Sequence, residues 1–327
     1  SDHVKRIHYP ALLVAVLLIG VKAASAEDAT PTEFKGVYDV DGRLHISLFG
    51  TPDGKPLTDG PNDLKPSWSM TGDKIVFFRT PRLTAQVSSW KTTICVINAD
   101  GSGFRKLTDG TQTDFNPTWS RDGKNRIYFS RRDPAAGRFA AYMTTADANP
   151  GDEVPVGDPT SGSYVLSCLK DGRVFVMGWS QTSRDRYFLL TPAAEGKTKM
   201  EPVKFAIPLP GLLDRLSVSP SETKVCYELQ KGFGAYKYPG RTLYIADFDV
   251  ATRTVSNPKA ITDPEPDPNV LWLYPCWTKD ESAVVYYSDK SGKPQLYLYR
   301  LADGSTILVS TNPNATYKHP CAEATPK

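Results

Sequence analysis

Short runs of β-branched and aromatic residues alternate with turns rich in Gly, Asp, Asn and Pro from residue 34 almost to the end of the sequence. The clearest example is the stretch 94–129, in which Asp100-Gly101 and Asp122-Gly123 separate the apolar runs. An Asp-Gly pair supplies the positive φ that a tight hairpin turn requires. Because no helical period is visible between the turns, this pattern predicts antiparallel strands and no helices.

One position, occupied by Trp119 in this stretch, recurs along the chain at intervals of 45 to 59 residues. An apolar run that predicts a strand follows each of the first five copies, and residues 34–49 supply two further runs near the other end. Repeats of this length are typical of propeller blades. We therefore predict an all-β, six-bladed β-propeller of four-stranded blades, closed by the N- and C-terminal strands in one blade. The six occupants are Trp68, Trp119, Cys168, Val218, Trp277 and Ala322.

The amino-acid sequence of the repeat resembles that of a known protein family. NADGSG at 98–103, LTDG at 107–110 and PTWSRDG at 117–123 closely resemble the repeat of TolB-type β-propellers, and LTDG at 57–60 and PSWS at 66–69 repeat part of it. The resemblance implies a TolB-like fold and a role in protein-protein interaction at the cell envelope.

This resemblance extends over about residues 34–322. TolB carries an additional α/β domain before its propeller, and this sequence has no room for one. Whatever TolB does through that domain is therefore not carried over.

The first 26 residues predict a membrane-directing segment. Lys5 and Arg6 precede the apolar run 11–21, and Ala24-Ser25-Ala26 has the form of a signal-peptidase site. One interpretation is a cleaved signal peptide. The other, which we carry forward, is a retained transmembrane helix with a cytoplasmic N-terminus, which would export the propeller.

A retained helix would pack against other membrane subunits through small side chains, and Ala11 and Ala15 lie four residues apart on one of its faces. Residues 27–33 then predict an extended linker, and 34–327 form the propeller. The expected location is a bacterial inner membrane, with the propeller in the periplasm. After cleavage, the protein would instead be soluble in the periplasm.

Charge and residue usage narrow the function classes. The formal net charge is +3, to which the first 26 residues contribute +2, so the propeller offers no basic face for nucleic acid. Only four histidines are present, two of them in the leader, and no G-x-S-x-G motif occurs. We therefore expect no enzyme activity, metal, cofactor or small-molecule substrate.

The cysteines and the repeated acids favour structural roles. Five cysteines leave at least one thiol unpaired, and a Cys276–Cys321 bridge is geometrically unfavourable although these residues occupy equivalent positions in adjacent blades. The repeated Asp residues are expected to cap their own turns rather than bind calcium. They are Asp59, Asp109, Asp122, Asp171, Asp263 and Asp303.

Two longer loops are candidates for partner binding. Residues 231–241 are basic and aromatic, and the insertion 79–91 contains Trp90 and several positive charges. Exposed Tyr, Phe, Trp and Arg are favoured at protein interfaces. The candidate contact residues in the first loop are Phe233, Tyr236, Tyr238 and Arg241.

Three functions remain open. The first is a non-catalytic, membrane-tethered accessory subunit of an envelope complex, such as a respiratory or photosynthetic assembly. The second is a soluble periplasmic TolB-like interaction protein, and the third is a carbohydrate-active, lyase-like propeller. The sequence favours the first.

Overall fold

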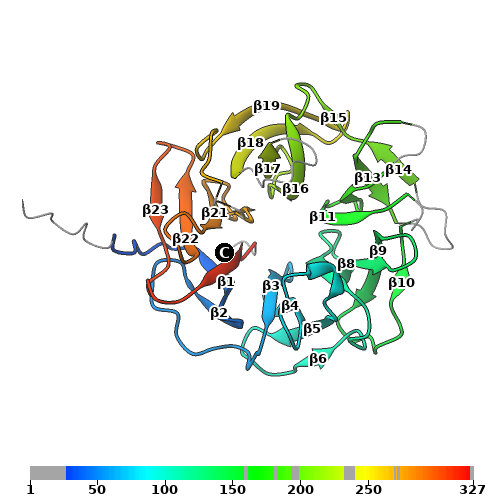
Figure 1. Cartoon of the computed structure of the whole chain (residues 1–327), viewed down its shortest axis with the longest axis horizontal. Coiled ribbons are helices and arrows are strands. Elements are labelled where there is room, and N and C mark those ends of the chain that lie inside the picture. Colours follow the sequence, from blue (N-terminus) through cyan, green and yellow to red (C-terminus); the bar gives the residue numbers. More distant parts are fainter. Residues whose placement is uncertain are drawn as a thin grey trace, which may run out of the picture.

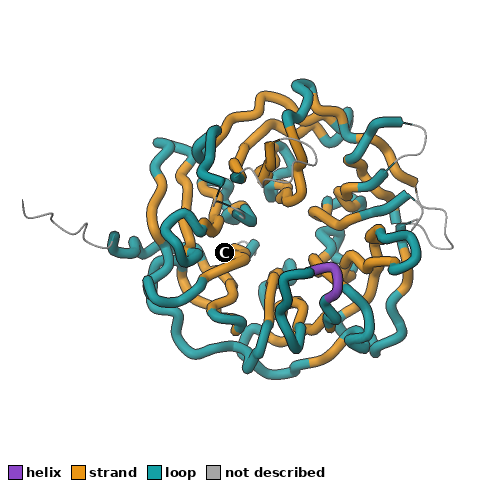
Figure 2. The backbone as a smooth tube through the Cα atoms, viewed as in Figure 1, coloured by secondary structure: helices purple, strands orange, loops and turns teal. Residues whose placement is uncertain are grey.

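A computed structural model describes residues 27–157, 161–179, 183–192, 199–231, 240–268, 270 and 273–324. Six β sheets surround a common axis as the blades of a propeller (Figure 1). Strands follow one another around the whole ring, and a single 3-10 turn, Val87–Ser89, interrupts the pattern in the described residues (Figure 2). The predicted six-bladed, all-β architecture is confirmed.

Each blade is antiparallel from its inner to its outer strand, apart from one added parallel strand, β15. The first two blades comprise β3 (Asp63–Trp68), β4 (Lys74–Arg79), β5 (Thr93–Asn98) and β6 (Arg105–Lys106), then β7 (Asp114–Trp119), β8 (Arg126–Asp133), β9 (Arg138–Thr145) and β10 (Val154–Pro155). The third and fourth comprise β11 (Tyr164–Cys168), β12 (Val174–Met177), β13 (Tyr187–Thr191) and β14 (Lys199–Pro202), then β16 (Gly211–Val218), β17 (Lys224–Lys231), β18 (Arg241–Asp249), β19 (Thr254–Ala260) and β15 (Lys204–Phe205). The last two comprise β20 (Cys276–Trp277), β21 (Ala283–Ser288), β22 (Gln295–Arg300) and β23 (Thr306–Leu308), then β24 (Tyr317–Ala322), β1 (Lys35–Val40) and β2 (Arg43–Leu48).

The two ends of the propeller meet in one blade, as predicted. β1 pairs with β24, with Val40 opposite Tyr317 and Gly36 opposite Ala322, and with β2 on its other side. This blade has three strands rather than the four expected. The chain after β2 makes only isolated backbone contacts with it, such as the bond from Leu57 N to Leu44 O at 2.7 Å, and forms no outer strand.

The recurring Trp position joins neighbouring blades. The indole N–H groups of Trp68, Trp119 and Trp277 each donate to a main-chain carbonyl of the preceding blade at 3.0 Å, and all three rings are buried. An aromatic ring fills the space between two blades while its one polar group is satisfied. The repeated Trp is therefore a bond between blades as well as core.

A second repeated feature is a buried ion pair at the start of the inner strand. Asp63 accepts two bonds from Arg79, at 2.6 and 3.0 Å, and Asp114 accepts two from Arg131, at 2.8 and 3.0 Å. Both carboxylates are fully buried. Their bidentate geometry offsets part of the loss of water, although burial still raises the pKa of Asp114.

Several smaller expectations are confirmed. All five cysteines are free. Five of the six repeated acids accept a main-chain N–H two residues ahead, as Asp109 does from Thr111 at 2.9 Å. These carboxylates cap their own turns.

Residues 27–33 form no strand or helix, but they contact the propeller. Thr30 N donates to Leu308 O at 2.9 Å and Thr32 N to Phe49 O at 2.8 Å, so the segment follows the rim where the last two blades meet. The predicted membrane helix lies outside the described residues. Within them, no helix is long and apolar enough to cross a bilayer.

Candidate functional site

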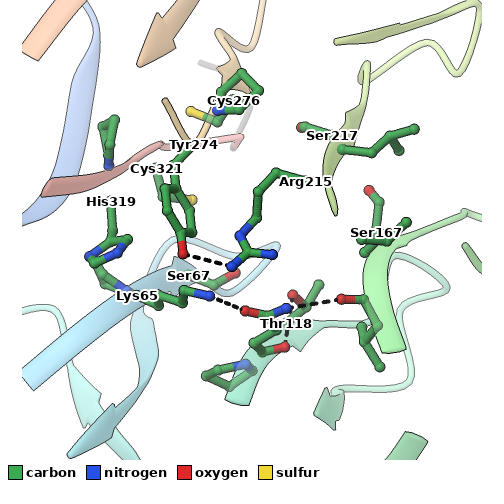
Figure 3. A pocket seen from close by; sticks show the side chains of 18 of the residues that line it. Lys65, Ser67, Thr118, Ser167, Arg215, Ser217, Tyr274, Cys276, His319 and Cys321 are labelled. Carbon is green, nitrogen blue, oxygen red and sulfur yellow. Dashed lines mark hydrogen bonds between the residues drawn. The ribbon is translucent and has the colours of Figure 1, made fainter. Parts of the chain in front are cut away.

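The inner strands of all six blades enclose a central cavity of about 190 Å³. Each blade contributes residues from the middle or second half of its inner strand, and the β20 blade also contributes the two residues before its strand. Their side chains stand around one space (Figure 3). Its lining includes the cationic side chains Lys65, Arg121 and Arg215, together with His319. Among the described residues that line it, none is Asp or Glu.

An unusual backbone conformation places four of these side chains. Lys65, Asn116, Tyr274 and His319 each precede a proline and have φ values between 44 and 53°. Pairing shifts register at this point in β3, β7 and β24, so the residue bulges out of the ladder. A positive φ is unfavourable for a residue with a β-carbon. In these four blades the conformation therefore directs one large polar or aromatic side chain toward the axis.

Lys65 lies where several blades meet. Its ammonium donates to Asn116 Oδ1 in the next blade and lies 4.7 Å from the centre of the Tyr274 ring. Burial, followed by the positive charge of Arg215, lowers the pKa of Lys65 well below its usual value. No carboxylate among the described residues forms an ion pair with it.

Arg215 approaches from the fourth blade. Its guanidinium donates to the Tyr274 hydroxyl at 2.8 Å and lies 4.6 Å from the centre of that ring (Figure 3). It also lies 5.7 Å from the Tyr164 ring. Arginine commonly stacks on aromatic faces in this way, and the contact fixes the planar donor group beside the cavity.

A buried charge cluster supports this wall from behind. Glu228 Oε2 accepts the main-chain N–H groups of Leu273 and Tyr274 at 2.8 and 3.0 Å, which holds the Tyr274 segment in place. Burial, and then the neighbouring charge of Asp214, raises the pKa of Glu228 to about 7. Arg241 Nη1 lies 2.8 Å from Asp214 Oδ2 and 3.4 Å from Glu228 Oε1, so one guanidinium faces both carboxylates.

His319 closes the ring from the last blade. Its Nδ1 lies 2.5 Å from Asp39 Oδ2, and its ring meets Tyr274 edge-on, with centroids 4.5 Å apart. Burial lowers the pKa of His319, although Asp39 opposes the shift. His45 stacks on Tyr38 at 6.3 Å elsewhere in that blade, so the two propeller histidines do not share a site.

Arg121 separates the cavity from a second one at the other end of the axis. Its guanidinium donates to Val218 O at 2.9 Å and Ser219 O at 3.3 Å, across the channel. The second cavity measures about 520 Å³ and includes Phe34, Lys170 and Lys279 in its lining. Arg121 thus forms the floor of the first cavity without an acidic partner among the described residues.

No protein-family model matches the sequence. Dipeptidyl-peptidase 5 of Porphyromonas endodontalis is 38% identical over 120 residues, which are 36% of this chain and only 16% of that protein. Among solved structures, TolB from Acinetobacter baumannii superposes with a TM-score of 0.64 at 13% identity, over 90% of this chain and 67% of that one. This chain has the fold of the TolB-type propellers.

TolB-type propeller folds occur with different activities. Hydrazine synthase of Kuenenia stuttgartiensis matches 92% of this chain and 48% of its own, with a TM-score of 0.64 and 14% identity. An oligogalacturonate lyase in complex with manganese matches 86% of this chain and 75% of its own, with a TM-score of 0.54 and 15% identity. At these identities the likeness establishes the fold alone.

The structure of this TolB-type propeller places two of the partner-binding residues predicted from the sequence. The prediction of Arg241 as a surface contact is wrong. Its side chain is only 4% exposed and lies between the carboxylates of Asp214 and Glu228. Trp90 is half-buried and supports its own loop. The remaining candidates, Ala11, Ala15, Phe233, Tyr236 and Tyr238, lie outside the described residues.

The central cavity is not among the features predicted from the sequence. A signal was present, because a proline stands two residues before four of the recurring positions and follows Lys65, Asn116, Tyr274 or His319. Four dissimilar residues before a shared proline indicate a common backbone that directs unlike side chains to one place. Nothing in the sequence alone shows that this place is the axis.

Proposed function

We propose that this chain is a non-catalytic protein-binding subunit, tethered to the membrane by residues 7–21, whose propeller docks onto membrane-protein subunits on the exported side of an envelope complex. The observation that carries the proposal is the β4–β5 loop, residues 80–92. It presents Leu83 and Val87, each 48% exposed, on a braced support. Exposed apolar side chains on a rigid loop are typical of interaction sites.

The bracing uses main-chain and aromatic contacts. Thr80 Oγ1 donates to Lys91 O at 3.0 Å, and Trp90 Nε1 donates to Thr84 O at 3.0 Å, so both ends of the loop are tied. Trp90 also meets Phe115 of the next blade edge-on at 6.1 Å. Because its conformation is fixed beforehand, the loop would lose little conformational entropy when a partner binds.

The position of the loop also favours docking. Arg79, where the loop begins, pairs with Asp63 at the start of β3. Lys231, where the second candidate loop begins, pairs with Gly211 at the start of β16. Both loops therefore leave the propeller on the face where the inner strands start. A partner could cover both loops and the mouth of the central cavity at once.

A double variant, Leu83→Asp with Val87→Asp, tests the proposal in native, detergent-solubilised membranes. We expect recovery of co-purifying membrane subunits to fall at least tenfold, because two charges would have to be buried in the interface. The matched control is Val154→Asp, which charges an apolar side chain of similar exposure, 43%, on the rim strand β10.

Two results would count against the proposal. Recovery of the double variant at the level of Val154→Asp would remove the loop from the interface. An intact mass that lacks residues 1–26 in the membrane sample would remove the tether, and would favour the soluble periplasmic alternative.

A further inference from the structure

We propose that the central cavity is a binding site for a small carboxylate group. The first argument is charge. Lys65, Arg121 and Arg215 reach it from three different blades, and no carboxylate stands among its described lining residues. Such a lining is unfavourable, as the lowered pKa of Lys65 shows, and an anion bound beside Lys65 would favour its charged form.

Nearby acids are already engaged elsewhere. Asp214 and Glu228 share Arg241 behind the wall, at 2.8 and 3.4 Å, and Asp39 pairs with His319 at 2.5 Å. Asp214 and Glu228 act on Arg215 and Lys65 from behind the wall, but none of these acids lines the cavity. Lys65 and Arg121 form no ion pair with a described carboxylate, so a ligand inside the cavity can supply one.

The remaining lining suits an oxyanion. Hydroxyl groups of Ser67, Thr118, Ser167 and Ser217 stand around the wall on four inner strands (Figure 3). Arginine offers a planar fork that matches a carboxylate, and lysine offers a point charge. Lys65, Asn116 and Arg215 are each partly accessible to solvent, so a ligand can reach them.

Size limits the ligand. The cavity, at about 190 Å³, is smaller than the roughly 300 to 1,000 Å³ typical of sites for drug-sized molecules. It can accept a small free acid or the carboxylate at the end of a partner chain. This inference departs from the expectation of no small-molecule ligand, and it does not depend on the docking loop proposed above.

Calorimetry on the full chain tests the site with succinate as the probe and succinamide as its uncharged counterpart. We expect succinate to bind and succinamide not to. Lys65→Met should weaken succinate binding about tenfold or more, because a charge-assisted contact is lost, while Lys65→Arg should retain much of it. Arg82→Gln removes an exposed cation of the neighbouring loop and should change nothing.

A second variant tests the same site if Lys65→Met does not fold. Asn116→Asp changes hardly any volume, but it places a carboxylate beside Lys65, so it should abolish succinate binding in a protein that melts normally. Tetra-alanine with a free or an amidated C-terminus tests whether the carboxylate belongs to a small free acid or to the end of a partner chain. Binding of only the free-acid peptide would assign the carboxylate to a chain end.

Three outcomes would overturn the proposal. They are equal binding of succinate and succinamide, succinate binding that survives both Lys65→Met and Asn116→Asp, and tighter binding of inorganic phosphate than of either carboxylate. Leu83→Asp with Val87→Asp should leave succinate binding unchanged. Failure of this site and failure of the docking loop are therefore separately observable.

Discussion

At the scale of single residues, the centre of this propeller combines unfavourable features that compensate one another. Lys65 and Asn116 adopt a left-handed backbone, and Glu228 is fully buried close to a second carboxylate, that of Asp214. Each feature costs free energy on its own, about 1 kcal/mol or more. Together they hold unlike side chains at fixed places around the axis.

Glu228 makes the stability of the protein depend on pH. Burial and Asp214 raise its pKa to about 7 in the folded state, above the usual value of 4.5, so the folded protein binds a proton that the unfolded chain releases. Stability should therefore fall as pH rises from about 4.5 to about 7, by up to a few kcal/mol.

Urea unfolding of the wild type and Glu228→Gln across this range isolates the effect, because other groups cancel in the difference. The free energy of unfolding of the wild type should decline relative to the variant as pH increases. A difference that stays constant with pH would show that Glu228 titrates normally.

At the scale of elements, hydrogen bonds join neighbouring blades, and the same indole bond recurs at three of these contacts. Trp119 in β7 donates to Ser67 O in β3, and both belong to inner strands that line the cavity. A shift of one blade relative to the next would therefore move residues that line the central cavity. Packing between blades supplies the rest, as where Phe78 meets Phe115 at 5.3 Å.

Trp119→Phe should destabilise the protein by about 1 to 3 kcal/mol, because it leaves the Ser67 carbonyl without its donor in a buried seam. Trp90→Phe is the matched control. Its indole bond to Thr84 lies within one exposed loop, so its loss should cost less than about 1 kcal/mol. Thermal unfolding of the two variants would measure this, and equal losses would mean that the bond between blades has no special weight.

At the scale of the whole molecule, stability depends on closing the ring. The last blade is built from both ends of the propeller, and β1 lies between β2 and β24. Its strands therefore have no covalent hairpin at the β1–β24 seam. Closure there removes two sheet edges that would otherwise be exposed.

Gly36→Ala should weaken the closure specifically. A β-carbon at Gly36 would come within 2.0 Å of the buried Phe49 ring, which has no room to move, and we expect a loss of about 1 to 3 kcal/mol or more. Hydrogen exchange should accelerate first in β24.

Gly123→Ala provides the comparison for this variant. It has open space around the new methyl group and only a positive φ of 75° as a penalty. If Gly36→Ala behaves like Gly123→Ala, the seam is less tightly packed than the structure indicates.

The sequence by itself determined the features that repeat. Six recurring positions, Asp-Gly turns and two terminal runs predicted the blade number, the turn caps and the closure, because each depends on residues close in the chain or on a fixed period. It could not predict the missing outer strand of the last blade, since strand formation there depends on what the segment after β2 finds to pair with.

Only the tertiary structure decided the candidate site. Lys65, Asn116, Arg215 and Tyr274 are separated by about 50 residues or more, and they meet only because the ring brings one position of every blade to the axis. Arg241 reads as a surface residue in a basic loop, yet the structure places it opposite two buried acids. Burial and charge pairing are properties of the assembled neighbours, and local sequence does not contain them.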